Sequence, residues 1–431
     1  MGVLGELLLA GAMLSTGSLN TVSKKIMYQT NGTTIDGIPP EEPYQKPWLC
    51  TFVMFCGESM CMVFFYLFAL YYKCKKMSRA KADQDFSRSQ TQSIASEIND
   101  ENLAKNPNEK KIVFVSQEET EGDPTGGLKW RFPFYAALFA SCDLLSTSLT
   151  GIGLTLVAAS VVQILRGFVI VITMFFAWIF LKRKPKVTQV LGVIFAVLGL
   201  GMVGTSAVLG DKSEQHPIHD TLKGIGLTIL SQVFSAFQFV FEEKLLKQND
   251  QKVGPIPSLF LVGSEGIAGA ILSISVALPI ANFIKGSDHG SYENMKNSFY
   301  MMFHNKLIFC LQFLYFISIA FFNWCSFVYS KTLSATARTL VDACRTIVVW
   351  IVMASVYQIF TNEPPLPYHQ YGEPVTYWSI LQCGGFILMM FGTITHNNIG
   401  GLGDKITSCC RKKNDIVDAA PLLKNEGEAN Q

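Results

Sequence analysis

Six ionisable side chains lie inside long apolar runs of the sequence, where water cannot solvate them. They are Glu58, Asp143, Arg166, Glu265, Asp342 and Arg345. A charged group near the centre of a lipid-embedded helix costs about 2.5 to 3.5 kcal/mol on insertion scales, so such groups face the interior of a helix bundle. The pattern predicts a polar central cavity, and its chemistry would be solute binding or proton transfer.

More than one role stays open for these groups. Asp342 and Arg345 are three residues apart on one helix face, so they either pair with each other or bracket a ligand. We expect Arg166 to meet substrate or Asp342. Glu58 and Glu265 either exchange protons, because burial disfavours a charged carboxylate, or stay protonated as hydrogen bonds between helices.

Ten apolar segments must position these side chains. A bilayer core of about 30 Å needs about 20 helical residues, and 49% hydrophobic against 16% charged residues supplies such runs repeatedly. The expected spans are 4–26, 48–72, 132–156, 158–181, 187–209, 224–246, 258–284, 307–330, 336–360 and 376–399. The predicted fold is an all-α membrane protein of about ten transmembrane helices.

Weak internal symmetry predicts two inverted five-helix repeats. Both Cys56-Gly57-Glu58-Ser59 and Gly263-Ser264-Glu265-Gly266 set a carboxylate among small residues. The run 155–160 precedes Arg166 as the run 332–336 precedes Asp342, which places the two charges at equivalent positions. We expect repeats at 1–209 and 210–400 and a tail at 401–431. Glycines in 187–209 and 376–399 are interpreted as packing positions.

The distribution of lysine and arginine among the loops predicts which side of the membrane each loop faces. Basic clusters follow the second, fourth and tenth spans, whereas 361–375 contains no lysine or arginine, so both termini are expected in the cytosol. The polar stretch of about 75–127 is predicted to be a disordered cytosolic linker within the first repeat. Glu242, Glu243 and Lys244 end the span 224–246, where they form either a salt-bridged gate or charges that face headgroups and water.

Signals for modification and sorting lie outside the spans. Asn31-Gly32-Thr33 is a glycosylation sequon in a loop expected to face the lumen. Cys409 and Cys410 precede a basic run and are either palmitoylated or an unmodified reduced pair. The tail carries the acidic dileucine pattern D-x-x-x-L-L, which predicts sorting adaptors as partners; its residues are Asp418, Leu422 and Leu423.

Several other classes of function are disfavoured by what the sequence lacks. It contains no P-loop, dinucleotide glycine fingerprint, H-E-x-x-H or nucleophile elbow. The net charge of +2 is not pooled in one region, which argues against nucleic-acid binding. We therefore expect no enzymatic activity, no cofactor and no metal site.

Short motifs in chain order resemble solute carrier family 35, subfamily F, of the drug/metabolite transporter superfamily. They are 14–21 (LSTGSLNT), 163–167 (QILRG), 241–244 (FEEK), 320–323 (AFFN) and 333–336 (LSAT). The resemblance implies ten helices in two inverted repeats around a substrate cavity, and it adds Asn323 to the candidate substrate residues. It also implies a lysosomal or related endomembrane location, with mitochondrial association as a secondary expectation.

The predicted function is secondary transport of a small organic solute across an endomembrane, with proton-coupled export from an acidic lumen as its mechanism. A nucleotide-sugar antiporter is one alternative, although the F-Y-N-N and G-A-L-N-K motifs of some such proteins are missing. A non-transporting membrane scaffold is another. Buried charges favour transport, because a scaffold does not need Glu58 or Arg166 at membrane depth.

Overall fold

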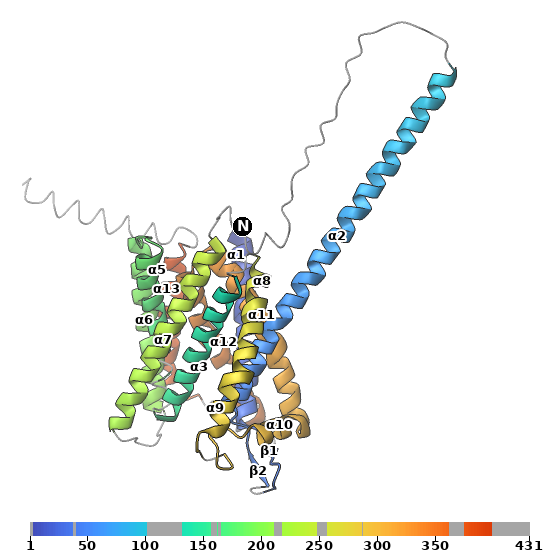
Figure 1. Ribbon diagram of the computed structural model, residues 1–431. Coiled ribbons are helices and arrows are strands. Elements are labelled where there is room, and N and C mark those ends of the chain that lie inside the picture. The colour runs from blue at the N-terminus through green and yellow to red at the C-terminus, as the bar shows by residue number, and fades with distance from the viewer. Residues whose placement is uncertain are drawn as a thin grey trace, which may run out of the picture.

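The chain forms a bundle of long helices with one small sheet at its end (Figure 1). The computed structural model describes residues 3–37, 40–100, 132–156, 162, 165–210, 218–247, 257–286, 288–361 and 375–398. We call the end with the sheet the hairpin end, and the opposite end, where the chain begins, the amino-terminal end (Figure 1).

The elements of the first half are α1 (Val3–Gln29), β1 (Asn31–Thr33), β2 (Glu41–Pro43), α2 (Pro47–Asp100), α3 (Phe132–Leu156), α5 (Phe168–Phe180) and α6 (Val187–Gly210). Those of the second half are α7 (Ile218–Lys247), α8 (Ser258–Leu272), a π-helical turn η1 (Ser273–Ala277), α9 (Leu278–Phe283), α10 (Met295–His304), α11 (Lys306–Thr332), α12 (Ala335–Thr361) and α13 (Ser379–His396). Described helical residues occur in all ten expected spans.

Eight helical stretches among the described residues are long and apolar enough to cross a membrane. They confirm a multi-pass membrane protein. Two expected spans are not among these eight stretches: α5, of which 13 residues are described, and α1. The span expected at 258–284 is a continuous helical path in which Pro279, lacking an N–H, follows the π-helical turn.

The hairpin end contains elements that the sequence did not predict. Strands β1 and β2 pair antiparallel, with Gly32 opposite Glu42, and Gly37 adopts a positive φ of 65° between them. Helix α10 is only ten residues long, and its N-cap Asn294 accepts a hydrogen bond from the backbone N–H of Asn297. The two strands and α10 are all much shorter than the apolar run of about 20 residues that indicates a membrane span.

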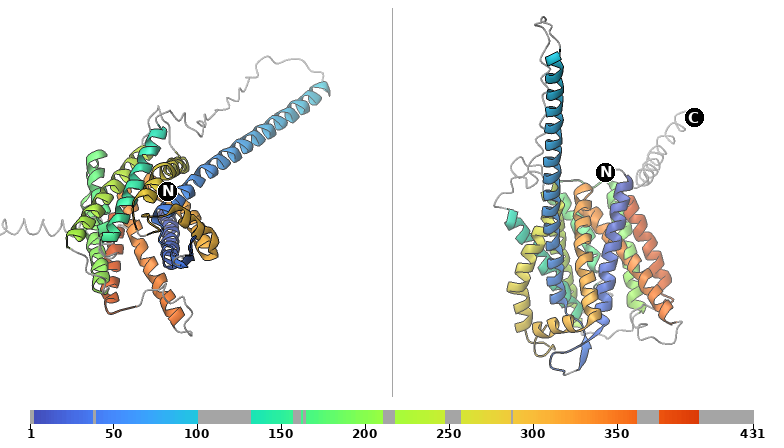
Figure 2. Two further views of the ribbon diagram at one scale, coloured as in Figure 1. Left: turned by 60° about the horizontal axis from the view of Figure 1, so that its bottom comes forward. Right: turned by 90° about the vertical axis from the view of Figure 1, so that its right-hand side faces the viewer.

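Helix α2 continues far past the expected membrane boundary, to Asp100, as Figures 1 and 2 show. The sequence predicts a disordered linker from about residue 75, and the first part of that segment is helical instead. The stretch 73–100 contains neither proline nor glycine, so no residue there stops a helix that the membrane span has already started. The rest of the linker lies outside the described residues.

Glycines line the most extensive of the helix contacts that the structure describes, between α6 and α13. A Cβ built at Gly199 would lie 2.5 Å from the carbonyl oxygen of Gly385, and one built at Gly192 would lie 2.7 Å from that of Gly392. The reciprocal positions are equally tight, at 2.6 and 2.5 Å. These four glycines are packing positions, as predicted, because only a residue without a side chain lets two backbones approach so closely.

Candidate functional site

Four carboxyl groups from four different helices converge inside the bundle. Glu58 lies on α2, Asp143 on α3, Glu242 on α7 and Glu265 on α8, and the groups are near enough for their charges to interact. The side chains of Glu58, Glu242 and Glu265 are buried. The structure thus brings three of the predicted site residues together with the first residue of the predicted gate. We call these four residues the carboxylate cluster.

Arg338, near the start of α12, neutralises one member of the carboxylate cluster. Its Nη1 donates to Glu242 Oε2 at 2.8 Å, and its guanidinium lies 4.3 Å from the ring centroid of Phe239 and 5.2 Å from that of Phe327. This buried arginine was not predicted from the sequence. Its position two residues after the motif 333–336 placed it at a span boundary, where charges usually face water.

Side-chain amides bind two of the other carboxyl groups. Asn323 Nδ2, on α11, donates to Glu58 Oε1, which supports its inclusion among the candidates. Gln238 Nε2, on α7, donates to Glu265 Oε1 at 2.6 Å and was not predicted. An amide donor suits both a carboxylate and the carbonyl oxygen of a protonated carboxyl.

Two oxygens of the carboxylate cluster lack a partner. Glu58 Oε2 and Glu242 Oε1 are buried, and within the described part of the chain neither has a hydrogen bond. A buried, unsatisfied carboxylate oxygen is costly, whereas a protonated one can donate, and a ligand can supply the missing donor. The cluster is therefore arranged to gain from a proton or a cationic group.

Two further positively charged residues, Arg345 and Lys24, have acidic and aromatic contacts. Arg345 Nη1 is 3.4 Å from Asp342 Oδ1, so these two residues pair along α12, one of the two arrangements predicted for them. Lys24 on α1 lies over the rings of Tyr28 and Tyr315, with its Nζ 5.5 and 5.8 Å from their centroids.

The predicted contact between Arg166 and Asp342 does not form. Arg166 is exposed, and although its charge interacts with those of Asp342 and Arg345, no ion pair joins it to either one among the described residues. The reason is geometric, because Arg345 lies one turn from Asp342 on the same helix and takes its carboxylate. The other expected role for Arg166, contact with substrate, stays a prediction.

The three residues of the predicted gate have three different environments. Glu242 belongs to the carboxylate cluster. Glu243 is fully buried and accepts hydrogen bonds from Arg183 Nη1 at 3.2 Å, Lys247 Nζ at 2.8 Å and the backbone N–H of Ala335 at 2.8 Å. Lys244 is exposed and lies over Phe241. The bonds to Glu243 tie the end of α7 to the start of α12 and to the α5–α6 connection.

A separate polar cluster joins the two halves at the hairpin end. Lys46 Nζ lies 2.9 Å from Glu42 Oε1 and 2.6 Å from Asp288 Oδ2, and Asn297 Nδ2 donates to Glu42 at 2.7 Å. Glu42 and Asp288 also lie near His289 in a spacing that a metal ion could use. Lys46 already provides the positive charge between the two carboxylates, so this geometry does not require an ion.

Glu293 caps the start of α2 at the same end. Its two carboxylate oxygens accept hydrogen bonds from the backbone N–H groups of Trp48 at 2.8 Å and Leu49 at 2.9 Å. Burial raises the pKa of Glu293 to about 7, although these two bonds and the nearby Lys46 favour the charged form. This carboxyl therefore titrates near neutral pH.

The remaining predicted sites lie at the periphery or outside the described residues. Asn31 is exposed on β1, and the backbone oxygen of Asn31 accepts a hydrogen bond from Asn305 Nδ2 at 2.9 Å. Its glycosylation stays a prediction. The cysteine pair Cys409 and Cys410 and the dileucine residues Asp418, Leu422 and Leu423 lie outside the described residues.

The helices and their buried charges define a multi-pass membrane protein with a polar interior, and comparisons with known proteins identify the class. Residues 112–205 match the EamA-like transporter family. Solute carrier family 35 member F6 of Rattus norvegicus is 30% identical over 419 residues, which cover 95% of this chain and 92% of the relative. The Homo sapiens protein of the same name is 28% identical over 404 residues, covering 91% and 89%.

A more distant relative is an uncharacterised protein of Schizosaccharomyces pombe, 28% identical over 268 residues, which cover 62% of this chain and 74% of the relative. The rat relative matches almost end to end. The chain belongs to solute carrier family 35 and is a membrane transporter of that family.

Proposed function

We propose that the protein is a secondary transporter that moves a small organic solute out of an acidic endomembrane lumen together with protons. The carboxylate cluster carries this proposal. Arg338 is the one ion-pair partner that the described residues give its four carboxyl groups, and Lys24 lies near enough to interact with Asp143, so full ionisation would leave more negative than positive charge inside a membrane bundle. Such a charge is too costly to persist in a low-dielectric interior, and protons or a bound solute must compensate it.

The contacts of the carboxylate cluster favour Glu58 and Glu265 as the proton carriers. Glu242 has Arg338 as its counter-ion, whereas Glu58 and Glu265 have only amide donors among the contacts that the structure describes. Without a paired cation, a buried carboxyl gains most from binding a proton. Alternating access would expose these groups first to an acidic lumen and then to the cytosol.

The pairing of helices supports two inverted five-helix repeats. An inverted repeat would relate each helix of one half to the helix five spans away in the other half. Under this exchange, the observed pair α3 with α7 corresponds to α11 with α1, which is also observed. The observed pair α5 with α7 corresponds in the same way to α12 with α1. The pair α3 with α8 likewise becomes α11 with α2. The remaining prominent pairs, α2 with α8, α6 with α13 and α5 with α12, map onto themselves. A pseudo-two-fold axis produces this pattern.

The orientation and address belong to the same proposal. Basic residues after the second and fourth expected spans support a cytosolic amino-terminal end and cytosolic termini, so the hairpin end would face the lumen. The dileucine pattern at Asp418, Leu422 and Leu423 supports a lysosomal or related endomembrane location through sorting adaptors.

Uptake into proteoliposomes tests this function. A broad metabolite panel, assayed with and without an imposed pH gradient, would identify the solute. Glu58→Gln and Glu265→Gln should then abolish accumulation against a gradient while downhill exchange continues, because Gln keeps the hydrogen bonds but carries no proton to exchange. Glu41→Gln, at an exposed carboxyl on β2, is the matched control and should behave like wild type.

Two results would count against the proposal. Concentrative uptake by both Gln variants at the wild-type level would remove these residues from coupling. Absence of any flux from the whole panel, with folded protein in the vesicles, would favour the non-transporting scaffold instead.

A further inference from the structure

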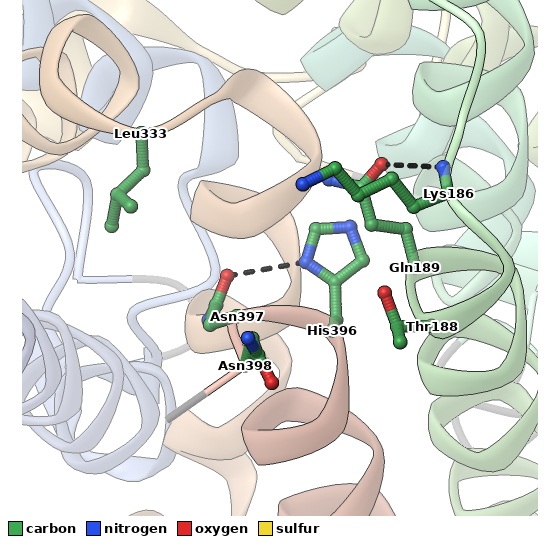
Figure 3. Close-up of a pocket in the computed structure, with 7 residues that line it drawn as sticks. All are labelled: Lys186, Thr188, Gln189, Leu333, His396, Asn397 and Asn398. Carbon is green, nitrogen blue, oxygen red and sulfur yellow. Dashed lines mark hydrogen bonds between the residues drawn. The ribbon is translucent and has the colours of Figure 1, made fainter. Parts of the chain in front are cut away.

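A small polar cavity lies at the amino-terminal end, where the start of α6 meets the end of α13 and the α11–α12 connection (Figure 3). Its volume is about 180 Å³. Because one liquid water occupies about 30 Å³, the cavity has room for a group larger than a single water. Its lining residues are Lys186, Thr188, Gln189, Leu333, His396, Asn397 and Asn398, and none of these is acidic.

The start of α6 presents positive charge to this cavity. The backbone N–H of Lys186 donates to Gln189 Oε1 at 3.0 Å, and the Lys186 carbonyl accepts from the N–H groups of Gln189 and Val190. The next two N–H groups, those of Val187 and Thr188, have no partner within the part of the chain that the structure describes. A helix start with free N–H groups carries a partial positive charge, and the Lys186 ammonium adds a full one.

Buried polar groups on α13 provide independent evidence for a ligand. His396 is 6% exposed, and its Nδ1 contacts Asn397 Oδ1 at 3.1 Å. Its other ring nitrogen points toward Lys186 and Gln189 (Figure 3) and has no hydrogen bond to any described residue. Asn397 Nδ2 is also buried without a partner. Unsatisfied polar groups around one cavity indicate that something polar fills it.

We propose that this cavity binds a phosphate group, carried by a lipid headgroup or by a free anion. Phosphate oxygens would accept from the α6 N–H groups, from Lys186 and from Asn397 Nδ2. The free ring nitrogen of His396 would donate when protonated or accept from a P–OH. Lys186 immediately precedes one membrane span and His396 ends another, so the cavity lies at the depth of phospholipid headgroups.

The position of the cavity gives a bound phosphate a route to the transport cycle. Leu333, which lines the cavity, accepts a hydrogen bond from Lys247 Nζ through its backbone oxygen. Two residues later, the N–H of Ala335 donates to Glu243. A phosphate that fills the cavity would therefore brace the α11–α12 connection. This regulatory part rests on the proposed transport function, whereas phosphate binding does not.

Binding to the purified full-length protein tests the site. The probes are inorganic phosphate and a phosphatidylinositol phosphate, each added to protein in micelles of a maltoside detergent, which contains no phosphate. Each probe is scored by direct binding and by the shift in thermal midpoint. Lys186→Gln should weaken the response about tenfold or more, the loss expected for one charge-assisted hydrogen bond. Asn397→Leu should weaken it without a change of charge, and Lys184→Gln, outside the lining, should not.

The outcomes separate the two sources of phosphate. A response to inorganic phosphate identifies a free anion, and a response to the phosphatidylinositol phosphate alone identifies a lipid headgroup. No response to either probe overturns the proposal. Equal losses in Lys184→Gln and Lys186→Gln, with no loss in Asn397→Leu, also overturn it, because they would show attraction to general positive charge.

Discussion

At the scale of single residues, the ion pair between Arg338 and Glu242 is the contact on which the carboxylate cluster most depends. Both side chains are buried, and loss of one partner from such a pair leaves an uncompensated charge that typically costs about 3 to 5 kcal/mol. Arg338→Gln should therefore lower the thermal midpoint in detergent strongly.

The matched double variant separates charge from packing. Arg338→Gln combined with Glu242→Gln keeps two hydrogen-bonding side chains but removes both charges, so it should regain most of the lost midpoint. If the double variant is as unstable as the single one, the pair acts through the shape of the arginine over Phe239 and Phe327 and not through its charge.

Glu293 gives the hairpin end a dependence on pH. Its pKa of about 7 in the folded protein lies above the ordinary value of 4.5, so its contribution to stability is complete below about 4.5 and is lost as pH rises through about 7. The full difference amounts to at most about 3 kcal/mol. The wild-type thermal midpoint should thus be higher near pH 5 than near pH 8.

Glu293→Gln isolates this group from its neighbours Lys46 and Asp288. The variant should lose the slope between the two pH values, whereas Glu41→Gln, on the exposed strand β2, should retain it. An unchanged slope in Glu293→Gln would show that Glu293 is not the source of the pH dependence.

Charged residues of the site could be predicted from the sequence when they lie deep within an apolar span, and not when they lie near its end. Glu58, Asp143 and Glu265 interrupt apolar runs and were identified from their cost in lipid. Arg338 and Gln238 were not, because the first lies one turn inside a helix start and the second is uncharged. The predicted contact between Arg166 and Asp342 does not form, because Asp342 pairs with Arg345, one of the two arrangements that their three-residue spacing predicts.

At the scale of elements, the crossing of α6 and α13 depends on the absence of side chains. Gly199→Val should destabilise the protein, because its Cβ would lie 2.5 Å from the carbonyl oxygen of Gly385 and 2.7 Å from the backbone nitrogen of Met389. Backbone atoms cannot retreat as a flexible side chain can, so we expect a loss of about 1 to 3 kcal/mol or more.

Gly201 on the same helix provides the control. It has no atom within 4 Å of a built Cβ, so Gly201→Ala should be neutral or stabilising by up to about 1 kcal/mol through helix propensity. Thermal unfolding followed by size-exclusion chromatography would compare the two variants. Equal midpoints would contradict the close crossing.

Helices could be predicted from the sequence where an apolar run has the roughly 20 residues that are needed to cross the bilayer core. The eight long apolar helices follow from that rule. Helix α10 and strands β1 and β2 are short and held by side-chain contacts such as that between Asn297 and Glu42, which no local pattern encodes. The extension of α2 to Asp100 shows the converse, since polar composition alone did not end a helix that lacks proline and glycine.

At the scale of the whole molecule, the amino terminus and Gly290 should lie on opposite sides of the membrane. Gly290 is exposed at a turn with φ of 85° near the hairpin end, so a short tag there should be tolerated. After selective permeabilisation of the plasma membrane, antibody should reach an amino-terminal tag but not the Gly290 tag. Staining of both would overturn the orientation.

Glu243 joins three separate parts of the chain through one carboxylate, since it binds Arg183, Lys247 and the N–H of Ala335. Separation of α7 from the other two parts would break the bonds to Arg183 and Ala335 together and leave the buried charge with Lys247 alone, on its own helix. Movement at the amino-terminal end should consequently be all-or-none, with a large activation enthalpy. The turnover rate would then rise steeply on warming, even for a solute that binds only weakly.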